Sequence, residues 1–480
     1  MTLRLFDTAT RTVRDFVPRV PGKVSMYVCG LTVQSPPHIG HLRSGVNNDV
    51  LRRWLTHQGL EVTYVRNITD IDDKVLLKAV EQDEPFWAIA YANEVRLEAA
   101  YRALNVASPT YEPRATGHIP EMHELIALLI ERGHAYVAQD GSGDVYFDVK
   151  TYPDYGALSG QRVDEMQSAG DAPDRAKRDP RDFALWKGVK PGEPDNAYWP
   201  SPWGRGRPGW HIECSAMTWR YLGAEFDIHG GGLDISFPHH ENEIAQSKSA
   251  GLAFARYWVH NAMLNLGGSK MAKSVGNVLD VEAIRRLGVR PIELRYYLSA
   301  AHYRSVIEYS EDSLREAAAG FQRIEGFLRR ATELLSATGA TEAGGEGRPA
   351  VLCAEFVEAM DDDLNTSAAY AAIHDVVREG NTALANGDLA SAAGALASVR
   401  AMLGVLGVDP LDAAWAQQDA TGGFKATVDA LVALALQQRA AARERKDWAA
   451  ADAVRDQLKE AGVVVEDTPH GPRWTIGSDQ

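Results

Sequence analysis

Val24-Ser25-Met26-Tyr27-Val28-Cys29-Gly30 is an apolar run that stops at a glycine, and the turn His38-Ile39-Gly40-His41 follows it closely. Such a run is typical of a buried β-strand. From His41 towards His57, apolar residues recur at helical spacing and predict a helix with one apolar face. Strand, turn and helix in this order bring backbone N–H groups and two imidazoles to a helix start, which is a suitable place for a triphosphate.

The two histidines of this turn suit the formation of an adenylate from ATP. Negative charge builds on the phosphate oxygens when a carboxylate attacks the α-phosphorus, and donors such as His38 and His41 that are aimed at this charge lower the barrier. Gly40 lacks a Cβ atom and so lets the adenine approach closely. On its own, however, the turn is also compatible with two ordinary surface histidines.

A second motif, Lys270-Met271-Ala272-Lys273-Ser274, strengthens this interpretation. It lies between glycines, and two lysines on a glycine-flanked loop can close over a polyphosphate and neutralise the departing pyrophosphate. The alternative is a solvated basic loop. Because both motifs are present in this order, we expect adenylate formation, with Lys270, Lys273 and the two histidines as catalytic residues.

Together the two motifs resemble the signatures of the class I aminoacyl-tRNA synthetases. The second signature in that class is usually Lys-Met-Ser-Lys-Ser, so Ala272 is a departure. Alanine removes one hydroxyl and neither charge, and we therefore expect the loop to work in this chain as well.

The composition is that of a globular protein with several domains. The chain has 480 residues, of which 45% are hydrophobic and 24% are charged, and this length predicts roughly two to four domains. No run is expected to reach the roughly 20 apolar residues of a membrane helix, and the N-terminus lacks the apolar core of a signal peptide. Three scattered cysteines argue against a disulfide framework. We expect a cytoplasmic protein with no membrane partner.

The net charge of −15 argues against indiscriminate binding of nucleic acid. It does not exclude an RNA partner, because an acidic protein can carry a local basic track. One candidate track follows the lysine motif and consists of Arg285, Arg286, Arg290, Arg295 and Arg304. Ordinary helix surface charge explains these residues equally well.

The first half of the chain alternates between strand and helix patterns. Glu61-Val62-Thr63-Tyr64-Val65 predicts a second strand, and the polar loop 66–74 follows it at the point where a doubly wound parallel sheet binds ligands. After a loop-rich insertion, Gly209-Trp210-His211-Ile212-Glu213-Cys214 is expected to resume the sheet. Helices are expected over 350–408, a break over 408–424, and one long helix with a short tail after it.

Four residues from distant parts of the chain could bind a metal. Cys29 ends the first strand, and Cys214 lies in the segment expected to resume the sheet. His239 and Glu243 are spaced i and i+4 after a proline, which places them on one face of a helix. Two thiolates, an imidazole and a carboxylate suit zinc. His240 is an alternative histidine ligand, and the spacing alone also fits ordinary core packing.

Longer motifs resemble one family within this class, the cysteinyl-tRNA synthetases, over nearly the whole chain. They are Tyr27-Val28-Cys29-Gly30, the loop 66–74, Gly209-Trp210-His211-Ile212-Glu213-Cys214-Ser215-Ala216-Met217, the segment 229–243, Met360-Asp361-Asp362-Asp363-Leu364-Asn365-Thr366 and the C-terminal tail. The resemblance implies one zinc ion per chain, held by Cys29, Cys214, His239 and Glu243. It also implies L-cysteine, ATP with Mg²⁺ and tRNA(Cys) as substrates, and we expect a monomer.

A metal in this place makes chemical sense. Serine differs from cysteine by one atom, and a pocket that recognises shape alone discriminates poorly between near-isosteres. The resemblance implies that the substrate thiolate binds the zinc directly, and zinc prefers a thiolate to an alcohol. The metal would then act as a specificity filter, and no editing site is expected.

The resemblance further assigns roles around the metal. Thr69 and the backbone of Cys29 would hold the substrate ammonium group, Trp210 would form a wall of the pocket, and His229 would line it. Asp234 would meet the adenosine ribose or the amino group. The ATP site would consist of His38, Gly40, His41, Gly230, Gly231, Asp234 and Lys273.

In the tail, the resemblance assigns anticodon reading to Arg443, Trp448, Asp452 and Asp467. A base can stack on an exposed indole, and carboxylates can accept hydrogen bonds from base N–H groups. Without the resemblance, this segment would be interpreted as a solvated amphipathic helix.

The expected architecture is an α/β, doubly wound (Rossmann-like) parallel-sheet catalytic domain with an insertion, followed by an α-helical bundle and a small anticodon-binding domain. The expected divisions are 1–120 for the first half of the catalytic domain, 121–205 for the insertion, 206–265 for the second half with the zinc site, 266–335 for the lysine loop and stem-contact region, 350–408 for the bundle and 425–480 for the anticodon-binding module.

Two rival functions share part of this pattern. A cysteine ligase of mycothiol synthesis activates cysteine in the same way but joins it to an amino-sugar, and that family lacks the terminal module. A catalytically inactive, synthetase-like RNA-binding protein would be expected to lose a histidine of the turn, a loop lysine or a metal ligand. None of these residues is missing from this chain.

Overall fold

Four parallel strands form the central sheet, in the order β10 (Phe254–Asn261), β9 (Glu225–Gly232), β3 (Lys23–Val28) and β4 (Glu61–Arg66). In their register, Val28 lies opposite Arg66 on one side and Gly230 on the other. Asn261 at the end of β10 lies opposite Gly232 at the end of β9. The carboxyl ends of all four strands therefore meet at one edge of the sheet, where doubly wound folds bind their ligands.

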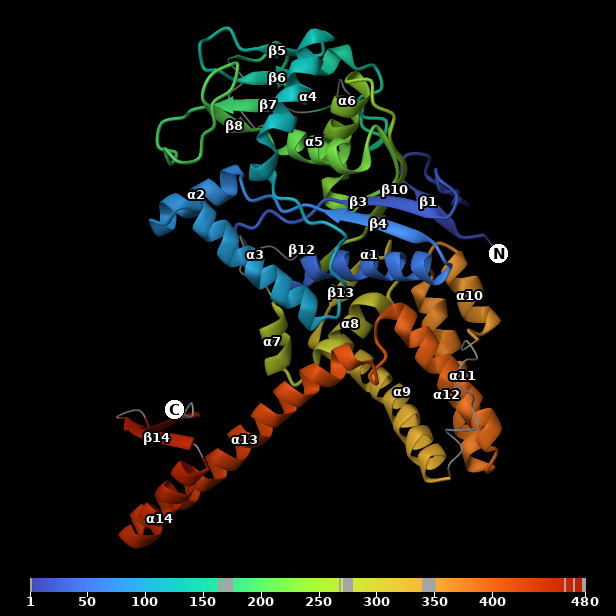
Figure 1. The fold of residues 1–480 in the computed structure, drawn as a ribbon, viewed down its shortest axis with the longest axis vertical. Helices are drawn as coiled ribbons and strands as arrows, with labels where there is room; N and C mark the ends of the chain where they lie inside the picture. The colour runs from blue at the N-terminus through green and yellow to red at the C-terminus, as the bar shows by residue number, and fades with distance from the viewer. Residues whose placement is uncertain are drawn as a thin grey trace. The chain divides into compact units, whose positions relative to one another are not determined.

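The computed structural model describes residues 2–162, 166, 176–266, 269–270, 279–338, 351–461, 463–468 and 471–476. The chain forms two units, Met1–Asp409 and Pro410–Gln480, which are described separately. In the first unit, helix α1 (Ile39–His57) covers one face of the sheet, and α5 (Trp210–Leu222) and α6 (Glu241–Ser249) cover the other (Figure 1). The predicted α/β fold with a doubly wound parallel sheet is confirmed.

Helix α1 begins at Ile39, slightly before its predicted start, because the histidine turn caps it. The ring of His38 accepts a hydrogen bond from the backbone N–H of His41 at 3.3 Å, and His41 Nδ1 accepts one from the N–H of His38 at 3.4 Å. The two rings stack with their centroids 3.5 Å apart. This reciprocal capping fixes both imidazoles at the N-terminus of the helix.

One predicted strand is wrong, because the segment from Gly209 to Cys214 begins helix α5. The strand that resumes the parallel sheet is β9, which follows that helix. Every residue from His211 to Thr218 is buried. Helix α5 therefore lacks a polar face, and the periodicity that distinguishes a surface helix from a buried strand is absent from its sequence.

An antiparallel sheet is inserted between the two halves of the parallel sheet. Its strands are ordered β5 (Ala135–Val137), β6 (Val145–Phe147), β7 (Phe183–Gly188) and β8 (Gly206–Pro208), and helix α4 (Ile119–Glu131) packs against β5 and α5. Short 3₁₀ or irregular turns lie at Ala115–His118, Val149–Thr151, Leu233–Ile235 and Ser236–His240.

Buried basic residues of the insertion hold the polar loop that follows β4. That loop leads into α2 (Asp73–Gln82), which packs against α3 (Phe86–Ala103). Asp73 forms ion pairs with Lys187 and Arg207 of the insertion. Burial would raise the pKa of the Asp73 carboxyl, but these two cations outweigh it and lower the pKa to about 2. The insertion thus holds the end of this loop at the start of α2.

A small three-stranded sheet leads into the segment that carries the lysine motif. Strand β11 (Leu264–Leu266) pairs in parallel with β13 (Ile307–Tyr309) and antiparallel with β12 (Ser269–Lys270). Helices α7 (Val281–Arg286) and α8 (Pro291–Ala300) lie between β12 and β13 in the chain. We call residues 267–278 the lysine loop; apart from the backbone of 269–270, they lie outside the described residues.

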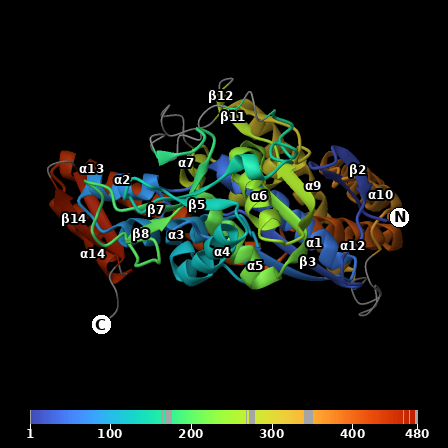
Figure 2. The same cartoon turned by 90° about the horizontal axis from the view of Figure 1, so that it is seen from above.

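Helices complete the first unit. They are α9 (Glu311–Ala337), α10 (Ala354–Asp361), α11 (Thr366–Ala385) and α12 (Leu389–Leu406), and α12 packs against α1, α9 and α11. The N-terminal hairpin of β1 (Arg4–Asp7) and β2 (Thr12–Asp15) lies beside α10 (Figure 2). There the N–H of Phe6 donates to Asp363 Oδ1 at 2.7 Å.

The apolar character of α12 corrects one expectation from the sequence. Its mean hydropathy over Leu389–Leu406 is 1.6. Among the described residues, this is the helix whose length and composition would allow it to cross a membrane. This helix packs against three helices of the same unit, and six of its 18 residues are buried there.

The basic track expected after the lysine motif is largely neutralised by carboxylates. Arg295 is completely buried and bonds Asp49 at 2.6 Å. Three other members also form ion pairs: Arg285 with Glu282, Arg290 with Glu293 and Glu325, and Arg304 with Asp363. Four of the five arginines are therefore paired with carboxylates, and the buried Arg295 fits neither the basic track nor ordinary helix surface charge.

The second unit contains more structure than the predicted long helix and short tail. Helix α13 (Ala413–Glu444) is followed by α14 (Trp448–Glu460) and by a hairpin of β14 (Val463–Thr468) and β15 (Gly471–Ile476). The predicted break over 408–424 is also too long, since α13 runs through Gly422 and Gly423. Lys446, with a positive φ of 59°, turns the chain between the two helices.

Candidate active site and metal centre

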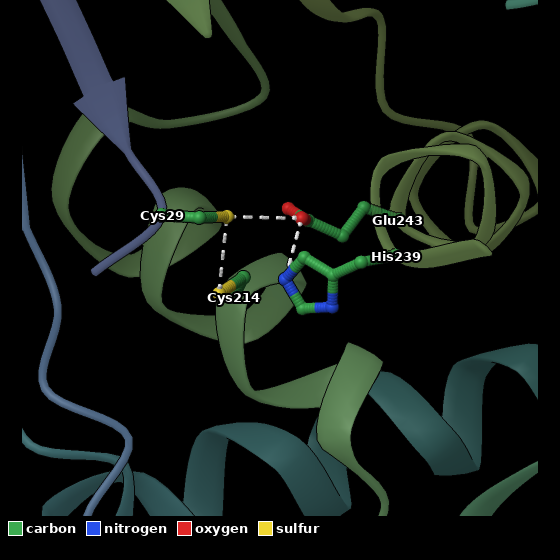
Figure 3. A group of neighbouring side chains, drawn as sticks. All are labelled: Cys29, Cys214, His239 and Glu243. Atoms are coloured by element: carbon green, nitrogen blue, oxygen red, sulfur yellow. Dashed lines mark hydrogen bonds and ion pairs between the residues drawn. The ribbon is translucent and has the colours of Figure 1, made fainter. Parts of the chain in front are cut away.

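The edge of the central sheet brings together four side chains that the sequence singles out. Cys29 follows β3, Cys214 lies in α5, His239 precedes α6 and Glu243 lies in α6. Figure 3 shows the four side chains pointing toward one another. Their ligand atoms all lie within 4.8 Å of one another, although the residues are far apart in the sequence.

The spacing of these atoms fits a tetrahedral zinc ion. Cys29 Sγ is 3.5 Å from Cys214 Sγ and 3.3 Å from Glu243 Oε1. His239 Nε2 is 3.1 Å from the same carboxylate oxygen. Metal–ligand distances of about 2.0 to 2.3 Å place the ligands of a tetrahedral zinc about 3.3 to 3.8 Å apart. Two sulfurs, one nitrogen and one oxygen are also donors that zinc accepts.

Two further buried histidines orient the ligands. His211 Nδ1 lies 3.0 Å from His239 Nδ1, which leaves Nε2 of His239 for the cluster. His229 Nε2 lies 2.9 Å from Glu243 Oε2, which leaves Oε1 of Glu243 for the cluster. Trp210 stacks on the ring of His239 with centroids 4.2 Å apart. Partners of this kind fix the orientation of metal ligands.

The cluster carries charge although it is buried. Burial raises the pKa of Glu243, but His229 and His239 outweigh it and lower the pKa to about 2. Burial lowers the pKa of His239, but the charges of Glu243 and Cys214 raise it to about 10. Burial also raises the pKa of Cys214, but the hydrogen bond from Cys29 and the nearby His239 lower it to about 6. Burial and the neighbouring Cys214 raise the pKa of Cys29. The net pKa shifts of Glu243, His239 and Cys214 therefore all favour the charged form of each side chain.

His240 offers a second possible set of ligands, together with Cys29, His229 and Glu243. Its Nδ1 lies 2.7 Å from His260 Nε2, and His260 Nδ1 lies 2.8 Å from Thr8 Oγ1, so His240 belongs to a chain of ring contacts that leads away from the cluster. The second set also lacks the thiolate of Cys214. Because zinc prefers soft thiolates, the geometry favours the set that contains His239.

A cavity of about 640 Å³ joins the cluster to the histidine turn. Cys29, Cys214 and His239 line one part of it, and His38, Gly40 and His41 line another. The other predicted site residues that line it are Thr69, Trp210 and Asp234. Small-molecule sites usually measure about 300 to 1,000 Å³. An amino acid at the cluster and ATP at the N-terminus of α1 would therefore share one chamber.

Asn67 is part of the site, although the sequence reasoning placed it only within a polar loop. Its Oδ1 accepts a hydrogen bond from the N–H of Gly30 at 2.8 Å, and its Nδ2 donates to Thr69 Oγ1 at 3.2 Å. A Cβ atom on Gly30 would lie 1.6 Å from the carbonyl oxygen of Asn67, so this position requires glycine. Asn67 thus fixes the backbone beside Cys29 and the hydroxyl of Thr69 together. Its place directly after β4 is the signal that could have revealed it.

Some predicted residues lie behind the cavity or outside the described part of the chain. His229 is completely buried and contacts Glu243. Gly230 and Gly231 lie inside β9, where the carbonyl of Gly230 accepts a hydrogen bond from the N–H of Cys29 at 3.1 Å. These three residues shape the sheet edge and do not line the cavity. Lys270 lies in β12, and Lys273 lies outside the described residues.

The predicted anticodon residues are spread over the elements of the second unit. Arg443 lies near the end of α13, and Trp448 begins α14 with its side chain 59% exposed. Asp452 is exposed and forms an ion pair with Arg455 at 3.3 Å. Asp467 lies in β14. An exposed indole at a helix start is available to stack on an unpaired base.

Comparisons with protein families cover most of the chain. Residues 15–319 match the family model described as tRNA synthetases class I (C) catalytic domain. Residues 355–409 match the DALR domain. Residues 421–474 match the cysteinyl-tRNA ligase anticodon binding domain.

Curated relatives extend over the same length. The chain is 58% identical to the cysteine–tRNA ligase of Nocardioides sp., over 99% of this chain and all of that protein. It is 58% identical to the cysteine–tRNA ligase of Streptomyces coelicolor, over the whole chain and 76% of that protein. A cysteine–tRNA ligase of Clavibacter michiganensis is 55% identical over the full length of both.

Solved structures of low sequence identity share the fold. The methionyl-tRNA synthetase of Mycobacterium tuberculosis, in complex with methionyl-adenylate, aligns over 81% of this chain and 90% of its own, with a TM-score of 0.57 and 16% identity. The LeuRS–tRNA–LeuAMS ternary complex of Agrobacterium radiobacter K84 gives a TM-score of 0.59 at 11% identity, over 84% and 86% of the two chains.

Proposed function

Because this chain belongs to the cysteine–tRNA ligases, a family of class I aminoacyl-tRNA synthetases, we propose that it activates L-cysteine as an adenylate beside a zinc ion and transfers it to tRNA(Cys). The observation that carries the proposal is a cavity that is lined both by Cys29, Cys214 and His239 of the four-ligand cluster and by the histidine turn. A cysteine held at the cluster would present its carboxylate toward a triphosphate held at α1.

The chain's own residues would supply the groups that adenylate formation needs. The cysteine carboxylate attacks the α-phosphorus of ATP, the bond to pyrophosphate breaks, and cysteinyl-adenylate forms. His38 and His41, fixed by mutual capping at the start of α1, would face the charge that develops on the phosphate oxygens. Lys270 and Lys273 would neutralise the pyrophosphate as it leaves. We expect Mg²⁺ to accompany the ATP, because this ion binds mainly through substrate phosphates.

Cys29, Cys214, His239 and Glu243 would hold one zinc ion. Zinc at this place would supply a Lewis acid that ligates a thiolate and discriminates against the hydroxyl of serine. Thr69, whose hydroxyl Asn67 orients, would hold the ammonium group together with the backbone carbonyl of Cys29. Trp210, stacked on His239, would close the pocket around the small side chain.

Transfer to RNA would complete the reaction. A ribose hydroxyl at the 3′ end of tRNA attacks the carbonyl of the adenylate, and AMP leaves. The match of residues 421–474 to an anticodon-binding domain supports tRNA as the acceptor and argues against an amino-sugar. We further propose that the enzyme is a cytoplasmic monomer.

The test is amino-acid-dependent exchange between ATP and pyrophosphate, with cysteine and serine compared on protein whose zinc has been counted by elemental analysis. We expect exchange with cysteine, little with serine, and about one zinc per chain. Exchange that persists at full rate after the zinc has been removed would overturn the metal filter. Absence of exchange from zinc-loaded protein would favour the inactive RNA-binding alternative.

The second unit allows a prediction about tRNA alone. Trp448→Ala should raise the KM for tRNA(Cys) about 5-fold to 150-fold, since stacking of one base contributes about 1 to 3 kcal/mol. Exchange between ATP and pyrophosphate should stay unchanged, because this step does not require the anticodon. A matched control is Leu431→Ala, another large apolar side chain of this unit, which is 61% exposed. Equal effects of both variants on the KM for tRNA would contradict the assigned role of Trp448.

A further inference from the structure

Arg43 lies in the first turns of α1, directly after the histidine turn, and its side chain is completely buried. Its guanidinium donates to four backbone carbonyls: those of Ala262 at 3.0 Å, Met263 at 2.7 Å, His302 at 3.2 Å and Ser305 at 2.5 Å. Over the ranges that the structure describes, Arg43 has no ion pair with a carboxylate. Since a buried charge is costly without partners, these four hydrogen bonds are what stabilise it there.

The four carbonyls belong to the two segments that enter the small sheet. Ala262 and Met263 directly precede β11, and His302 and Ser305 precede β13. Because β11 and β13 pair in parallel, their amino ends lie side by side. One side chain of α1 therefore holds the entry of both strands, and β11 leads directly to β12 and the lysine loop.

The same helix also holds the other end of the lysine loop. The backbone N–H of Ile39, the first residue of α1, donates to the carbonyl of Leu279 at 2.8 Å. Leu279 is the first described residue after the loop. Described residues on both sides of the lysine loop, Ala262 and Met263 before it and Leu279 after it, are thus bonded to the first turns of α1.

We propose that Arg43 is a positioning residue for adenylate formation, which holds the lysine loop in register with the histidine turn. The inference rests on the proposed function of the loop lysines. Arg43 itself takes no part in the bond changes and does not line the cavity. Its effect is geometric, because a displacement of a charged group by about 1 Å can lower the rate of a reaction about 100-fold. Burial lowers the pKa of Arg43 to about 10, so the guanidinium stays charged at neutral pH.

A double-mutant cycle tests this coupling. Arg43→Lys keeps the charge but cannot reach four carbonyls, because an ammonium group lacks the planar fork of a guanidinium. We expect it to lower kcat for cysteine-dependent pyrophosphate exchange about 10-fold or more, with the KM for cysteine and the zinc content unchanged. When Lys270→Ala is already present, Arg43→Lys should lower kcat little further, since both changes act through the same loop. Losses that multiply across the cycle would overturn the inference.

Arg295→Lys is the matched control. Arg295 is equally buried and donates to the carbonyls of Leu104, Asn105 and Leu406 and to Asp49, and none of these partners belongs to the small sheet. We expect it to lower the melting temperature without changing kcat.

Failure of the proposed role of the lysine loop can be distinguished from failure of the Arg43 inference alone. If Arg43→Lys fails to fold, Arg43→Gln, which removes the buried charge and keeps two amide donors, replaces it in the cycle. A normal rate for Lys270→Ala alone would overturn the proposed role of the loop and this inference with it. A slow Lys270→Ala enzyme with multiplying losses would overturn the inference alone.

Discussion

Replacing Cys29 by serine should remove zinc from the protein and abolish selective binding of cysteine. The Sγ atom of Cys29 lies 3.5 Å from that of Cys214 and 3.3 Å from Glu243, at the centre of the four-ligand set. A hydroxyl is a far poorer zinc ligand than a thiolate. Loss of a partner that merely orients a ligand already costs about 10-fold to 100-fold in metal affinity, so we expect a loss of more than about 100-fold here.

The measurement combines elemental analysis of zinc after dialysis with the KM for cysteine in pyrophosphate exchange. Cys353→Ser is the control, because Cys353 lies at the start of α10, where its Sγ is 3.6 Å from Met402 Sδ. It should keep full zinc and an unchanged KM. Circular dichroism should show the same fold for both variants. If Cys29→Ser keeps its zinc and its affinity for cysteine, the metal filter is refuted.

Lys273→Ala should slow formation of the adenylate about 100-fold to 1,000-fold, a loss typical for removal of one group that stabilises the charge of a transition state. The KM for cysteine should stay the same, because the proposed contact is to pyrophosphate and not to the amino acid. Ala272 stands where the class I signature usually has serine, and it removes a hydroxyl but neither lysine charge, so the proposed electrostatic role of the motif rests on Lys270 and Lys273.

The measurement is the single-turnover rate of adenylate formation at saturating cysteine. Lys23→Ala is the control. Lys23 is a surface lysine that pairs with Glu61 at 3.1 Å. It begins β3, whereas the candidate site lies where β3 ends. It should react at the normal rate. A Lys273→Ala enzyme as fast as the control would exclude the assigned role of the lysine.

Local patterns were sufficient to predict the elements that decide the architecture. The apolar run that ends at Gly30 is β3, and the helix after His38-Ile39-Gly40-His41 is α1. One failure occurred where burial removes a pattern, because helix α5, which is buried from His211 to Thr218, is predicted as a strand. The hairpin β14–β15 lies where the sequence predicts only a short tail after a long helix.

The sequence also predicted the residue types of the metal site, but it did not predict which of these residues meet in space. Two cysteines, a histidine and a glutamate suit zinc wherever they occur, yet spacing alone could not decide between His239 and His240. Folding decides this, because His211 fixes the ring of His239 at the cluster while His240 meets His260.

The sequence by itself predicted strand β3, the helix after the histidine turn, the two signature motifs and the chemical types of the ligands, because each depends on residues close together in the chain. Only the tertiary structure decided which ligands meet, that Asn67 joins Gly30 to Thr69, and that Arg43 of α1 bonds the segments that enter β11 and β13. The reason is physical. Parallel strands bring residues hundreds of positions apart to one edge of a sheet, and side-chain hydrogen bonds to distant backbone carbonyls leave no periodic pattern in the sequence.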